Sequence, residues 1–150
     1  MDNLRATGAV ALLWISVALA AAAQEAAAPV ERRMSQTELL ARAGSATEPV
    51  VVLDVRTAEE FVAGHVPGAR HLPHDQIAQR IGELEALRDR DVVVYCRSGR
   101  RSQLALGVLR AHGFTRLWQL DGDFLAWQAQ GRPIEAGTPA TTETVTPAPQ

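Results

Sequence analysis

The chain has 150 residues, 47% of them hydrophobic, which suffices for one domain with a buried core and leaves too little for two. Its 15 basic residues are all arginine and stand against 17 acidic ones, so the net charge of −2 excludes a general attraction to nucleic acid or to an anionic membrane. A single cysteine excludes an internal disulfide and a thiolate metal site.

The first 23 residues have the pattern of a signal peptide. Arg5 precedes an apolar run over residues 9–23, which ends in three alanines ahead of Gln24. As a helix this run would span about 22 Å, short of the ~30 Å hydrocarbon core of a bilayer. Counting back to Ala6 lengthens the helix to about 27 Å and leaves an uncleaved anchor open. We expect residues 1–23 to be removed on export, which places the mature protein in the periplasm without membrane contact.

Both flanks of the remaining chain are poor in core-forming residues. Residues 24–30 form an Ala-rich lead-in, and residues 136–150 form a Thr, Pro and Ala tail with too few large apolar side chains to pack. We therefore expect a disordered tail and one folded domain over residues 31–135.

Helix and strand signals alternate from the start of this domain. Ser35 and Glu38 form a capping box at the first expected helix. Residues 50–55 are a short apolar, β-branched run that predicts a buried strand. A second capping box at Thr57 opens a short helix, which ends at Gly64.

The middle of the domain continues the alternation. Asp75 is placed to cap a helix whose apolar residues Ile77, Ile81 and Leu84 lie on one face. Residues 92–95 predict a second buried strand.

The last third predicts a helix over residues 102–112 with a stop at Gly113, and then a strand over residues 116–120. A final helix over residues 123–130 ends at Gly131. Continuous apolar strands that alternate with helices predict an α/β fold with a parallel sheet covered by helices on both faces.

Two polar segments follow the buried strands, at the edge where ligands bind in such sheets. Asp54 and Arg56 end the first, and the loop 96–101 follows the second. Backbone N–H groups that turn into a helix N-terminus form an anion cradle, and Gly99 permits the positive φ that such a turn often needs. These donors favour the thiolate of Cys96 and would also stabilise a persulfide on its sulfur.

Three arginines in this loop contradict the usual preference of a helix N-terminus for negative charge. Arg97, Arg100 and Arg101 would be compensated by a bound oxyanion, which indicates a functional site. The alternative is a buried, inert cysteine beside solvated arginines.

A series of motifs runs in order along the domain: residues 52–56, Glu60-Phe61, residues 64–69, residues 95–102, Asp121-Gly122 and Trp127. These motifs and their order resemble those of the rhodanese family, as a single-domain protein of exported type. The resemblance implies a five-stranded parallel sheet and an enzyme that passes sulfur from thiosulfate, or a similar donor, through a persulfide to cyanide or a thiol. It implies no cofactor.

The same resemblance assigns roles within the loop. Cys96 is the expected nucleophile. Asp123 departs from the family, which usually has a second glycine there, and leaves the local turn in doubt. The residues expected to bind the substrate and cradle the persulfide are Arg97, Ser98, Gly99, Arg100, Arg101 and Ser102.

Asp54 and Arg56 are expected to support the residues of the loop from outside it, and each has a simpler alternative role. Asp54 either braces the loop or an arginine, or only forms a turn. Arg56 either adds to the anion site or forms a solvated ion pair. His71 and His74 flank Pro73, but no other residues in the sequence complete a metal-ligand set, so no metal is expected.

Two other functions stay open. Cysteine-loop phosphatases and arsenate reductases have arginine at the sixth position after the cysteine, where this chain has Ser102, and Arg101 closes a shorter loop. The second open function is that of a persulfide carrier or a binding module for a partner protein. Because the chain has no second cysteine to resolve a persulfide, the sulfur acceptor, whether a small molecule or a protein, must come from outside.

Overall fold

The computed structural model describes residues 32–137, apart from residues 44, 46 and 48. The predicted signal peptide, the lead-in and residues 138–150 of the predicted tail lie outside the described residues. In the described part, no helix is both long and apolar enough to cross a membrane.

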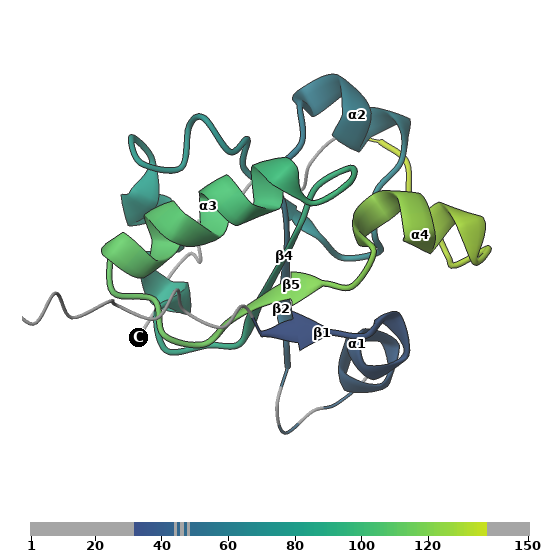
Figure 1. Cartoon of the computed structure of the whole chain (residues 1–150), viewed down its shortest axis with the longest axis horizontal. Coiled ribbons are helices and arrows are strands. Elements are labelled where there is room, and N and C mark those ends of the chain that lie inside the picture. Colours follow the sequence, from purple (N-terminus) through teal and green to yellow (C-terminus); the bar gives the residue numbers. More distant parts are fainter. Residues whose placement is uncertain (1–31, 44, 46, 48, 138–150) are drawn as a thin grey trace, which may run out of the picture.

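Five parallel strands form one sheet in the order β1-β5-β4-β2-β3 (Figure 1). The two central strands, β2 and β4, are buried along their whole length, as expected for strands covered on both faces. The predicted parallel α/β sheet is therefore confirmed. The strands are β1 (Arg33–Met34), β2 (Val51–Asp54), β3 (Arg70–His71), β4 (Val92–Tyr95) and β5 (Leu117–Leu120).

Helices cover both faces of the sheet, as predicted (Figure 1). Helices α1 (Gln36–Ala43), α2 (Ala58–Ala63) and α4 (Asp123–Ala129) lie on one face. Helix α3 (Arg100–Ala111) and the 3-10 helix η1 (Ile81–Leu87) lie on the other.

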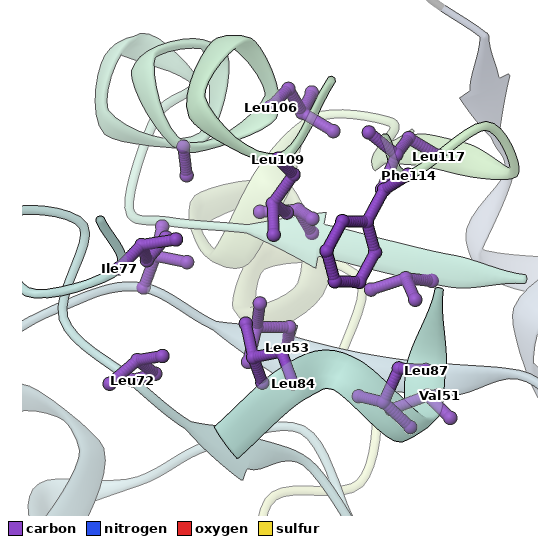
Figure 2. Close-up of a cluster of buried hydrophobic side chains, with 14 of the residues drawn as sticks. Val51, Leu53, Leu72, Ile77, Leu84, Leu87, Leu106, Leu109, Phe114 and Leu117 are labelled. Atoms are coloured by element: carbon purple, nitrogen blue, oxygen red, sulfur yellow. The ribbon is translucent and has the colours of Figure 1, made fainter. Parts of the chain in front are cut away.

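Each face of the sheet has its own hydrophobic cluster because side chains alternate along a strand. Val92 and Val94 point toward α3 and η1, whereas Val93 and Tyr95 point toward the face of α1, α2 and α4. Figure 2 shows the first cluster, in which Leu84, Leu87, Leu106 and Leu109 from η1 and α3 pack against Val51 and Leu53 of β2. Cys96 belongs to this same cluster.

The helix predicted after Asp75 is wrong as an α-helix. Residues 74–80 form turns, and η1 begins only at Ile81. The apolar residues Ile81, Leu84 and Leu87 recur every third position, which matches the three residues per turn of a 3-10 helix. A spacing of four from Ile77 to Ile81 suggested the α-helix, but that step crosses the turn.

Two further differences concern short elements and a helix start. Strands β1 and β3 have only two residues each, too few to show a periodic pattern, and only the family resemblance implied them. Helix α3 begins at Arg100, two residues before its predicted start, because Gly99 with φ 109° is its N-cap.

Candidate active site

The cysteine loop joins the end of β4 to the start of α3. Cys96 follows Tyr95 directly and is only 1% exposed. The backbone N–H of Gly99 donates a hydrogen bond to Cys96 Sγ at 3.1 Å. The sulfur is therefore buried, as the alternative of an inert cysteine predicts. It also accepts a hydrogen bond from a backbone amide of the loop, as the anion cradle requires.

Helix α4 holds the loop from the other side. The backbone N–H groups of Phe124 and Leu125 donate to the carbonyls of Cys96 and Arg97, each at 3.0 Å. The N–H of Cys96 in turn donates to the carboxylate of Asp123 at 2.7 Å. Both backbone polar groups of the cysteine are thus bound to the first turn of α4.

Asp123 makes the turn that the sequence left in doubt. Gly122 and Asp123 both have positive φ, at 73° and 51°. The Asp123 side chain is buried and also accepts hydrogen bonds from Ser102 and Gln119. The sequence singled out Asp123 only as a departure from the family's usual glycine, because nothing in a single sequence indicates that its carboxylate reaches the cysteine.

Arg101 is paired with an acidic residue from α2. Its guanidinium donates to both carboxylate oxygens of Glu60, at 2.6 and 2.9 Å. The hydrogen bonds from Arg101 lower the pKa of Glu60 to about 2. Glu60 also raises the pKa of Arg101, and Cys96 contributes a smaller effect in the same direction.

The Glu60–Arg101 pair accounts for one of the three loop arginines without a bound oxyanion. The first turn of α3 contains no acidic residue, and we expected a bound oxyanion to compensate its arginines. At Arg101, Glu60 supplies that compensation from the protein itself. The sequence indicated Glu60 as part of a family motif and as the partner of Thr57 in a capping box, and gave no sign of its pairing with Arg101. The capping role is present, because Glu60 Oε2 accepts a hydrogen bond from the N–H of Thr57 at 3.1 Å.

The other loop arginines are exposed. Within the described residues, neither Arg97 nor Arg100 forms an ion pair. Arg97 borders an open cavity of about 270 Å³ beside the loop. The cavity combines charged residues with an apolar wall, and its lining includes Arg56, Glu60, Arg97, Phe124, Leu125 and Ile134.

Asp54 and Arg56 form a buried ion pair at the carboxyl end of β2, level with the end of β4. Arg56 is 3% exposed, so the solvated pair is wrong. Its guanidinium donates to Asp54 (2.6 Å) and to the Gly64 carbonyl (2.7 Å), and lies over the Phe124 ring. Asp54 thus braces an arginine, and it also accepts the Tyr95 hydroxyl at 2.6 Å.

Among the predicted loop residues, Gly99 contacts the Cys96 sulfur directly, and Arg97 lines the same cavity as Arg56. Ser98 is exposed, whereas Ser102 is buried and donates to the Gly99 carbonyl at 2.7 Å. No group of three or more metal-ligating side chains occurs among residues 32–137 as described.

A buried cysteine at the carboxyl end of a central parallel strand, in a loop that turns directly into a helix, defines an α/β domain of the cysteine-loop class. A family model described as a rhodanese-like domain matches residues 35–130. The chain belongs to the rhodanese-like family, as the resemblance implied.

Similar proteins agree with this assignment. A protein named sulfurtransferase from Allochromatium vinosum is 41% identical over 100 residues, which cover 67% of this chain and 92% of that protein. Thiosulfate sulfurtransferase GlpE from Pseudomonas putida (strain GB-1) is 40% identical over 82 residues, covering 55% and 73%. The solution structure of the rhodanese-like domain of the Alr3790 protein from Anabaena sp. matches with a TM-score of 0.62 at 30% identity, covering 80% of this chain and 87% of that one.

Proposed function

We propose that this protein is a sulfurtransferase that moves sulfur from thiosulfate, or a similar donor, to cyanide or a thiol through a persulfide on Cys96. The family and the sulfurtransferase names of its relatives support sulfur transfer in general. The observation that carries the specific proposal is the contact between Cys96 Sγ and the N–H of Gly99 at the start of α3.

The reaction has two steps that share one covalent intermediate. The Cys96 thiolate attacks the outer sulfur of thiosulfate, a new S–S bond forms, and sulfite leaves with the electron pair of the broken S–S bond. The acceptor then attacks the outer sulfur of the persulfide, and the Cys96 thiolate is released. Cyanide would leave as thiocyanate, and a thiolate would leave as a new persulfide anion.

The loop supports both anionic forms of the cysteine. The Gly99 N–H faces the sulfur, and the positive end of α3 begins one residue later. Arg97 and Arg100 are the exposed cations of the loop that would meet the sulfonate oxygens of the donor. The burial of Cys96 shields its sulfur from bulk solvent.

Phosphatase chemistry finds less support in this loop. The position where those enzymes have arginine is Ser102, whose hydroxyl is bound to the Gly99 carbonyl and to Asp123. The neighbouring cation, Arg101, is paired with Glu60. A tetrahedral phosphate would therefore lack a free guanidinium at that point of the ring. A carrier that passes its persulfide to a protein acceptor shares the first step and differs only in the second.

The test is the Cys96→Ser variant. A hydroxyl has no anion near neutral pH and forms no persulfide, so we expect thiocyanate formation from thiosulfate and cyanide to disappear while the fold stays cooperative. Intact mass spectrometry of the native protein after incubation with thiosulfate should show one added sulfur atom, and the variant should show none. Thr115→Ala is the control, because this exposed hydroxyl lies ahead of β5 and outside the cysteine loop. Activity of Cys96→Ser near the native level, or phosphate-ester hydrolysis faster than thiocyanate formation, would contradict the proposal.

A further inference from the structure

We propose that Asp123 is a positioning residue for the sulfur-transfer loop, and that its carboxylate holds the backbone of Cys96 in the geometry needed for attack. This inference rests on the proposed role of Cys96, and it adds a residue from outside the loop to the transfer machinery.

The carboxylate joins three elements that meet at the cysteine. Its Oδ1 accepts the backbone N–H of Cys96 at 2.7 Å and the hydroxyl of Ser102 at 3.1 Å. Its Oδ2 accepts the side-chain amide of Gln119 at 2.9 Å. One side chain therefore connects the end of β4, the first turn of α3 and strand β5.

The backbone of Asp123 indicates that this arrangement is specific. Among the residues that the structure describes, Asp123 is the one non-glycine residue with positive φ, at 51°. Such a conformation has an energetic cost for a residue with a Cβ, and it persists where surrounding contacts determine it. Here those contacts are the hydrogen bonds of the carboxylate, in a residue that is only 2% exposed.

The expected effect is on the rate of the chemical step more than on donor binding. Asp123 does not line the cavity beside Arg97, and its contact is with the N–H of the nucleophile itself. A shift of the Cys96 backbone would move Sγ away from the Gly99 N–H, and small misplacements of reacting groups reduce rates strongly. We therefore expect loss of the carboxylate to lower kcat while the KM for thiosulfate changes little.

Two substitutions separate the hydrogen bonds from the backbone strain. Asp123→Gly removes the carboxylate and tolerates the positive φ, so backbone strain at this position does not add to the effect of the lost hydrogen bonds. Asp123→Asn keeps an acceptor for Cys96. The N–H group of the new side-chain amide can also form a hydrogen bond. Oε1 of Gln119 is buried without a partner in the described structure, and a flip of the Gln119 amide would turn this oxygen toward the new N–H group. The asparagine variant should therefore retain native behaviour.

A matched control lies at the opposite end of β4. The carboxylate of Asp91 is also buried and binds the side chains of Arg42, Arg116 and Trp118. Asp91→Ala breaks a network of similar size without touching the cysteine loop. It should lower the melting temperature and leave Cys96 unaffected.

The experiment measures kcat, KM and the rate at which iodoacetamide alkylates Cys96, the one cysteine of the chain, at an alkaline pH where the native rate has reached its plateau. For Asp123→Gly we expect kcat to fall about tenfold and alkylation to become about threefold faster, because the buried sulfur becomes mobile. Asp123→Asn should stay within about twofold of native in both. Native alkylation and kcat in Asp123→Gly, or equal loss in Asp123→Asn, would overturn the proposal.

Alkylation needs no sulfur donor, so it distinguishes the two proposals. A native protein that forms no thiocyanate would contradict the proposed function, while the alkylation rates would still decide the role of Asp123. If Asp123→Gly does not fold, Gln119→Met replaces it, because this variant removes the bond that orients the carboxylate. Faster alkylation of Gln119→Met would support positioning, and an unchanged rate would overturn it.

Discussion

Arg97 is an arginine of the loop that is exposed to solvent and also lines the neighbouring cavity. It borders this cavity without an ion pair in the described structure, whereas the guanidiniums of Arg56 and Arg101 are bound to carboxylates. An anionic donor that approaches Cys96 would therefore gain most from Arg97, with Arg100 as the second exposed cation of the loop.

Replacement of Arg97 by alanine should weaken donor binding. A charge-assisted hydrogen bond contributes about 1.5–3 kcal/mol, so kcat/KM for thiosulfate should fall by roughly ten- to a hundredfold, mainly through KM. Added salt should raise the native KM because it screens this attraction, and the variant should respond less. Arg80→Ala removes an exposed arginine that pairs with Glu83, and serves as the control. A variant with native KM and native salt dependence would contradict this role of Arg97.

The sequence predicted the polar residues of the site better than their partners. Cys96 and its loop were evident because strand, loop and helix are contiguous in the chain. Glu60 and Asp123 were not, because their contacts with Arg101 and Cys96 span 41 and 27 residues. Likewise, the burial of Asp54 and Arg56 depends on Tyr95 and Phe124, which other elements bring to them. Burial then raises the pKa of Tyr95, assisted by the charge of Asp54, so the phenol stays protonated as a donor.

At the scale of elements, Glu60 connects α2 to the start of α3. One of its oxygens caps α2 at Thr57 and also accepts from Arg101, so one carboxylate serves two helix N-termini. The sequence indicated the capping box correctly because both of its residues lie within four positions of each other. The link to α3 depends on the packing of the sheet, which local patterns do not contain.

The Glu60–Arg101 pair should make stability depend on acid pH. Arg101 lowers the pKa of Glu60 from 4.5 to about 2, so the unfolded chain takes up a proton at higher pH than the folded one. This contribution to the free energy of unfolding is complete above pH 4.5 and is lost as the pH falls to about 2. Glu60→Gln should therefore flatten the dependence in this window, measured by urea unfolding. Glu85→Gln, which removes an exposed ion pair with Arg88, should leave this pH dependence unchanged and serves as the control. An equal pH dependence of the free energy of unfolding in the native protein and in Glu60→Gln would contradict the expectation.

Short elements were the least predictable part of the fold. Strands β1 and β3 form the edges of the sheet with two residues each, and their pairing partners are strands β5 and β2. An element of this length has no detectable period, so it is identified by its neighbours alone. The 3-10 helix η1 was mistaken for an α-helix because spacings of three and four residues both fit a short apolar pattern.

The sheet could be predicted because its central strands are continuous apolar runs. Each run supplies both hydrophobic clusters, which requires helices on both faces and brings the carboxyl ends of β2 and β4 to one edge. The order of the strands could not be derived from these runs. It follows from the pairing of β4 with both β2 and β5, which separates β1 and β2 despite their closeness in the chain.

The N-terminal apolar segment bears on the cellular location of the protein. We propose that residues 1–23 direct export and are then removed, because the apolar run ends in small residues and is shorter than a membrane span. The full chain, expressed in a Gram-negative host, should appear in the periplasmic fraction with an N-terminus near Gln24, as determined by intact mass. A matched variant with Ala21 and Ala23 both changed to Arg should block cleavage while the rest of the chain is unaltered. Native protein recovered only with membranes, with Met1 retained, would favour an anchor and contradict cleavage.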